Sequence, residues 1–104
     1  MIDKARIKEL RDTFGDVEFV ELIELFREEA GEIVGALPDR AGSELADGLH
    51  TLRGSADNMG LCDLSARCRQ GETQFAAGNE PDIEDITAAF TDGLRALSAH
   101  MGLP

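Results

Sequence analysis

Apolar residues recur along most of the chain at intervals of three and four positions, which is the period of one helix face. Four long segments show this period, at about 16–37, 43–59, 63–78 and from 81 onward. A shorter segment of the same kind, about 3–13, precedes them. No segment shows the strict alternation of apolar and polar residues that is typical of a half-buried strand. The pattern therefore predicts helices only.

Residues that begin or end helices lie between these segments. Asp3 is expected to cap the first helix, which Phe14-Gly15 ends, and Pro38 lies just beyond the second. Ser43 is the expected N-cap of the third helix, and Gly60 is its C-terminal signal. Short connections place successive helices antiparallel. We predict an all-α fold in one domain, residues 1–104: an antiparallel up-and-down four-helix bundle with a short additional N-terminal helix.

The composition agrees with this fold and excludes several partners. The chain has five Phe but no Trp or Tyr, and a formal net charge of −11. Such an acidic protein repels nucleic acid and anionic membrane surfaces, so neither is expected as a partner. No apolar run is long enough to cross a bilayer, and the start MIDKARIKEL lacks the apolar stretch of an export signal. We therefore expect a cytoplasmic protein.

The cysteines and histidines do not have the spacing of a metal site. Cys62 and Cys68 are six residues apart on one predicted helix, so their side chains point in different directions and no disulfide is expected. A metal or haem site would have only His50 and His100 to draw on, and His100 lies near the end of the chain. We expect no metal and no cofactor.

His50 is predicted to lie on the surface of the third helix. At about 100° per residue, Leu49, Leu52 and Ala56 fall within about 40° of Leu45, on the core face, whereas His50 lies about 140° from it. Arg53 and Gly54 follow His50 by three and four residues and are its neighbours on the helix surface. A glycine inside a helix costs roughly 1 kcal/mol relative to alanine, so Gly54 calls for an explanation.

The charge around His50 differs from that of the whole chain. Residues 45–70 contain three acidic and three basic residues, whereas the remaining chain contains 18 acidic and seven basic residues. An acidic partner can therefore approach this neutral window more easily than the rest of the surface.

The sequence HTLRGSADNMGL, which begins at His50, resembles the signature of the histidine phosphotransfer (HPt) domain. That signature has the form H-x-L-K/R-G-S-x-x-x-hydrophobic-G. An acidic helix of the type E-x-x-x-x-F, here Glu21 to Phe26, precedes it, and the chain length and helix count also fit. The matching residues of the motif are His50, Leu52, Arg53, Gly54, Ser55, Met59 and Gly60.

The resemblance implies a phosphorelay protein and a role for four residues. His50 is the implied phosphoacceptor, Arg53 the residue that stabilises the phosphate, and Gly54 the residue that leaves room for it. In the family, a Gln or Glu 22 residues after the histidine orients its ring, which implies Glu72. Glu72 also lies about 80° from the apolar face of its own helix, at a flank from which it can reach His50. Its carboxylate is expected to accept Nδ1–H and leave the Nε2 lone pair outward.

Two residues depart from the family pattern. Arg53 stands where lysine is commoner, and the two cations present their donors differently. Asp57 lies one further turn along the His50 face, where its carboxylate repels a phosphohistidine unless Arg53 or a basic residue of the partner neutralises it. This repulsion bears on the transfer rate.

We expect reversible phosphoryl transfer between receiver-domain aspartates of response regulators, or from a histidine kinase, by a monomeric carrier. The chain has no Gly-rich phosphate loop and no carboxylate cluster for Mg²⁺, so ATP-dependent kinase activity is not expected and the Mg²⁺ belongs to the receiver. The alternative is a helical protein-docking module of the same fold whose His50 is never phosphorylated. The Met1 start and the Gly-Leu-Pro end favour a free-standing protein over a fragment of a longer chain.

Overall fold

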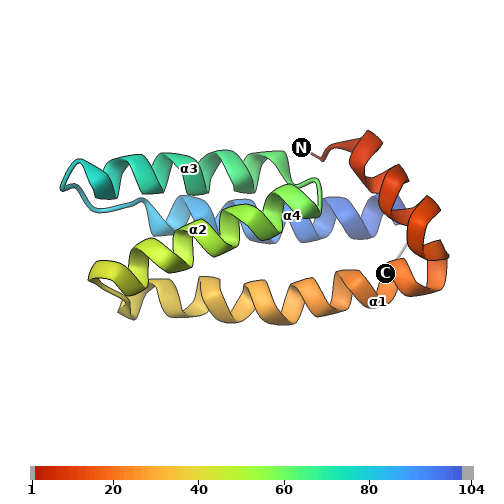
Figure 1. Cartoon of the computed structure of the whole chain (residues 1–104), viewed down its shortest axis with the longest axis horizontal. Helices are drawn as coiled ribbons and strands as arrows, with labels where there is room; N and C mark the ends of the chain where they lie inside the picture. The colour runs from red at the N-terminus through yellow and green to blue at the C-terminus, as the bar shows by residue number, and fades with distance from the viewer. Residues whose placement is uncertain (1, 102–104) are drawn as a thin grey trace.

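The first helix contains a break that the sequence predicted. The structure, a computed structural model, describes residues 2–101, and helix α1 (Lys4–Ala36) is its first element. Gly15 has φ 79° and ψ 165°, outside the helical region, so the chain turns there between an N-terminal arm, residues 4–14, and a long arm, residues 16–36. Figure 1 shows the red arm at a steep angle to the orange one. Gly15 is suited to this turn because it has no side chain to oppose a positive φ.

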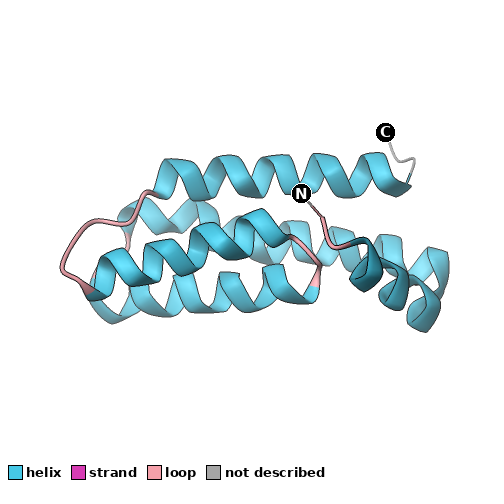
Figure 2. Ribbon diagram, turned by 90° about the horizontal axis from the view of Figure 1, so that it is seen from above, coloured by secondary structure: helices cyan, strands magenta, loops and turns pink. Residues whose placement is uncertain are grey.

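The remaining elements complete an up-and-down bundle. A short 3₁₀ turn, η1 (Leu37–Asp39), leads into α2 (Gly42–Asn58), α3 (Cys62–Ala76) and α4 (Ile83–Met101). In Figures 1 and 2 the long arm of α1 and the other three helices run along the long axis of the molecule in alternating directions. The predicted all-α four-helix bundle with a short additional N-terminal helix is confirmed. Within residues 2–101, no helix is long and apolar enough to cross a bilayer.

The apolar faces of the helices meet in one core. The predicted stripe of α2 is buried along its whole length, because Leu49, Leu52 and Ala56 are each 0% exposed. Leu45 and Met59 are buried at its two ends. Gly48 lies at the edge of this stripe, where a Cβ atom would be 3.2 Å from Leu37 Cδ2. Among the pairs of helices, α2 and α3 have the most extensive contact with each other. The functional side chains described below lie on these two helices.

Caps and turns fix the ends of α2. The Asp3 side chain accepts from the Arg6 backbone N–H at 3.2 Å, as predicted for α1. The predicted N-cap of α2, Ser43, is wrong: the helix begins at Gly42, which has φ 56°, and the cap is Ala41, whose backbone is extended and whose carbonyl accepts the Leu45 N–H at 3.4 Å. Gly60 ends the helix at φ 71°, as predicted, and its carbonyl accepts the Asp3 N–H at 2.7 Å. The N-terminal arm is thereby tied to the turn between α2 and α3.

Candidate functional site

His50 projects from the solvent-facing side of α2. Its side chain is 70% exposed, whereas its neighbours along the chain toward the core, Leu49 and Leu52, are fully buried. The helical period places it there, because a residue that follows a core position by one is rotated by about 100° away from it. The structure thus agrees with the surface position expected for His50. An imidazole at this site is open to a reacting partner.

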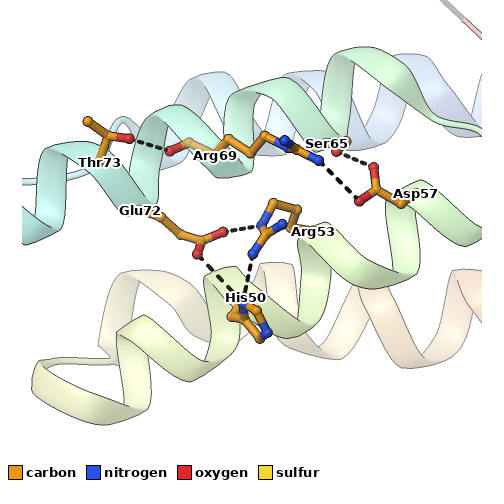
Figure 3. Close-up of polar contacts among 7 residues, drawn as sticks. All are labelled: His50, Arg53, Asp57, Ser65, Arg69, Glu72 and Thr73. Atoms are coloured by element: carbon orange, nitrogen blue, oxygen red, sulfur yellow. Dashed lines mark hydrogen bonds and ion pairs between the residues drawn. The ribbon is translucent and has the colours of Figure 1, made fainter.

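Arg53 lies between His50 and helix α3. Its Nη2 atom is 2.9 Å from His50 Nδ1, and its Nε atom donates to Glu72 Oε1 at 2.6 Å (Figure 3). The guanidinium therefore contacts the two groups through two different nitrogen atoms. The hydrogen bond and the charge of Glu72 raise the pKa of Arg53 above its ordinary value. Arg53 is a permanent cation next to the imidazole.

Glu72 reaches the site from α3. Its Oε2 atom is 3.6 Å from His50 Nδ1, which is an ion-pair distance but is longer than a hydrogen bond. The direct Nδ1–H bond expected from the sequence is therefore not formed, because the Glu72 carboxylate binds Arg53 instead. The side chain is 28% exposed, so its charge is partly shielded from water. Its proximity to His50 agrees with the expected position, and its orienting role stays a prediction.

Gly54 leaves open space beside the histidine. A Cβ atom at Gly54 would meet no heavy atom within 4 Å, other than the backbone of its own helix. This differs from Gly48 and Gly71, where neighbouring leucine and isoleucine side chains approach a Cβ atom to 3.2 Å. Packing of helix against helix therefore explains those two glycines but not Gly54. Access to His50 stays the predicted reason for it.

Asp57 binds α3, an arrangement that the sequence analysis missed. Ser65 Oγ donates a hydrogen bond to Asp57 Oδ1, and Arg69 Nη2 lies 3.6 Å from Asp57 Oδ2 (Figure 3). Ser65 is 5% exposed, so its hydroxyl needs this acceptor. The Asp57 carboxylate is therefore paired with Arg69 of this chain. The sequence analysis had expected neutralisation only by Arg53 or by a basic residue of the partner.

A signal for these contacts is present in the sequence. His50, Arg53 and Asp57 are spaced by three and four residues along α2, and Ser65, Arg69 and Glu72 are spaced by four and three along α3. Each set lies on one face of its helix. The tight turn at Gly60 makes the two helices antiparallel neighbours, so the sets pair in reverse order: His50 with Glu72, and Asp57 with Ser65.

The other nucleophile near the site is inactive by burial. Cys68 is 0% exposed, and its burial raises the pKa of its thiol to about 12, so it is a neutral thiol at physiological pH. Within residues 2–101, no three His, Cys, Asp or Glu side chains gather as a metal site requires. The chemistry available is that of an exposed imidazole with a cation on one side and open space for an anion on the other.

The comparison with protein families agrees with this geometry. The model of the family described as Hpt domain matches residues 21–100 of the chain. The matched region begins in the long arm of α1 and includes all of α2 and α3, and with them every residue of the site. Comparisons with curated proteins and with solved structures found no match.

Proposed function

Because the chain belongs to the Hpt domain family, we propose that it carries a phosphoryl group on His50 in a two-component phosphorelay. The observation that carries this proposal is the 70% exposed imidazole next to the Arg53 cation, within the family match. Histidine phosphotransfer in two-component systems is what the family suggests. His50 as the phosphoacceptor, with Arg53, Gly54 and Glu72 as its supporting residues, is our own assignment.

The transfer proceeds by in-line attack. The Nε2 lone pair of neutral His50 forms a bond to the phosphorus of an aspartyl phosphate on a receiver domain, and the P–O bond to that aspartate breaks. The electron pair of the broken bond leaves on the aspartate, which becomes a free carboxylate. Such transfers depend on positioning and charge stabilisation, and Arg53 supplies a cation next to the ring. The reverse reaction delivers the phosphoryl group to a second receiver.

The surface around His50 suits a receiver domain or a histidine kinase, the partners of this family in general. The active site of a receiver is acidic, and the neutral window of residues 45–70 repels it less than the rest of this chain does. The Mg²⁺ ion for the reaction belongs to the receiver, because the residues around His50 are a guanidinium and its carboxylate partner. We propose that the chain acts as a monomer in the cytoplasm.

The test is direct transfer from a phosphorylated partner. The chain is incubated with ³²P-labelled receiver domains and Mg²⁺, and the label on each protein is followed over time. We expect label on this chain that is lost in acid and retained in base, as phosphohistidine is. A broad panel of receivers and kinases from the same organism that leaves the chain unlabelled would contradict the proposal. Stable binding to a receiver without any label would favour the docking module instead.

Asp57 is expected to have a small effect on transfer. Because Arg69 and Ser65 already bind its carboxylate, an Asp57→Asn variant should transfer within about threefold of the wild-type rate. The free energy of unfolding should fall by about 1 kcal/mol, because the amide is a weaker acceptor for Ser65 and Arg69. Transfer kinetics and thermal unfolding measure the two effects. A tenfold faster transfer would show that the Asp57 charge still reaches the phosphohistidine.

A further inference from the structure

The contact between Arg53 and His50 determines which ring nitrogen carries the proton. Arg53 Nη2 lies 2.9 Å from His50 Nδ1, within hydrogen-bond distance. A guanidinium has donors only, so Nδ1 must be the acceptor of this bond. In a neutral imidazole the other nitrogen, Nε2, then carries the hydrogen. Figure 3 shows that second nitrogen pointing away from Arg53 and Glu72.

This tautomer is the wrong one for attack. A nitrogen that carries a hydrogen has no free lone pair, so Nε2 cannot form a bond to phosphorus in this state. Glu72 is in position to stabilise the opposite tautomer, because its Oε2 lies 3.6 Å from Nδ1. It does not do so, since Nδ1 has no hydrogen to donate while Arg53 occupies it. Arg53 therefore occupies the ring nitrogen whose hydrogen Glu72 is expected to accept.

We infer that Arg53 holds His50 in a resting tautomer and must leave Nδ1 before phosphoryl transfer, so that Glu72 can accept Nδ1–H. The part of this inference that concerns phosphoryl transfer rests on the proposed function, whereas the resting tautomer follows from the contact between Arg53 and His50 alone. An incoming phosphoryl group offers the guanidinium a dianionic partner in place of a neutral nitrogen, and this attraction draws Arg53 away. Arg53 is then both the positioning residue of the resting state and the cation of the reacting state.

Each proton and electron pair has a defined destination in the proposed steps. After Arg53 leaves, proton exchange with water moves the ring proton from Nε2 to Nδ1, because the His50 side chain is 70% exposed. The Nδ1–H then donates to the Glu72 carboxylate. The Nε2 lone pair attacks the phosphorus of the aspartyl phosphate, and the P–O bond breaks with its electron pair on the aspartate. The phosphorylated ring keeps the proton on Nδ1, next to Glu72.

Nitrogen NMR of the histidine ring tests the resting tautomer without any phosphodonor. Two-bond ¹H–¹⁵N correlation spectra distinguish protonated from unprotonated ring nitrogens, and are recorded at a pH where His50 is neutral. We expect Nε2–H in the wild type and a shift of about tenfold toward Nδ1–H in Arg53→Met, the effect of one hydrogen bond to a charged group. Arg69→Met, which removes a nearby arginine that does not touch His50, is the matched control and should keep the wild-type spectrum.

Three spectra would overturn the inference: Nδ1–H in the wild type, an unchanged tautomer in Arg53→Met, or an equal shift in Arg69→Met. The wild-type spectrum alone decides the first of these, whether or not a variant folds. A chain with the expected spectra that no receiver or kinase labels would refute the proposed function and leave the resting tautomer in place. The two failures are therefore distinguishable.

Arg53→Lys tests the effect on reactivity. A lysine keeps the positive charge for the phosphate, but its single ammonium nitrogen cannot reproduce the fixed planar arrangement in which Nε binds Glu72 and Nη2 binds Nδ1. The probe is phosphoramidate, whose P–N bond breaks as Nε2 attacks, with ammonia as the leaving group. We expect the lysine variant to be phosphorylated at least about threefold faster than the wild type, with more Nδ1–H in its spectrum. An equal or slower rate would show that Arg53 does not mask the histidine.

Discussion

Replacing His50 by glutamine is expected to abolish phosphoryl transfer and to leave the bundle folded. Glutamine has no ring nitrogen with a free lone pair, so no phosphoryl group can bind at this position. Its side chain will remain on the surface, because His50 is 70% exposed and the core residues on either side of it are unchanged. Arg53 loses one contact but keeps its hydrogen bond to Glu72 at 2.6 Å. The free energy of unfolding should change by no more than about 0.5 kcal/mol.

The matched control is His100→Gln, which changes the second histidine of the chain. His100 is exposed in the last turn of α4, beside the N-terminal arm and away from α2. The measurement is acid-labile label after incubation with a phosphorylated receiver, together with thermal unfolding of both variants. We expect background label in His50→Gln and wild-type label in His100→Gln. Label retained by His50→Gln would place the phosphoacceptor elsewhere in the chain.

The helices were predictable because their apolar residues are regular. The break at Gly15 and the end of α2 at Gly60 were also predictable, because a glycine at the end of an apolar helical pattern is a common helix-end signal. Both glycines have the positive φ that only glycine adopts without strain. The start of α2 was not, because serine is the usual cap and nothing in the sequence shows that Gly42 turns the chain first. A cap depends on local backbone geometry that periodicity does not contain.

The site was predictable along one helix and less so between two. The surface position of His50 and the open space at Gly54 follow from the period of α2 alone. The contact of Arg53 with both His50 and Glu72 depends on how the side chains of α2 and α3 share the space between them. A helical wheel places residues on faces but does not show whether the Glu72 carboxylate binds Arg53 or His50. The same limit explains why the neutralisation of Asp57 by Arg69 was missed.

Replacing Gly54 by leucine is expected to block transfer while the fold becomes no less stable. A Cβ atom at Gly54 meets no heavy atom within 4 Å, so the leucine side chain will project into the open space next to His50. Under the proposed function, the phosphoryl group and the receiver surface approach Nε2 through that space. A displacement of about 1 Å in a reacting geometry can cost about a hundredfold in rate, and a leucine side chain is several times larger than this. Transfer should therefore fall at least about a hundredfold.

The stability of this variant separates blocked access from misfolding. Leucine is better than glycine inside a helix by roughly 0.8 kcal/mol, so the unfolding temperature of Gly54→Leu should be equal to or above the wild-type value. Gly35→Leu is the matched control, because Gly35 lies in α1 and is also free of heavy atoms within 4 Å of its Cβ position. It should show the same gain in stability with unchanged transfer.

Gly54→Ala adds one methyl group in open space and should transfer within about threefold of the wild type. Unimpaired transfer by Gly54→Leu would mean that access to His50 does not depend on this glycine, and helix α2 would then tolerate it for a reason other than phosphoryl transfer.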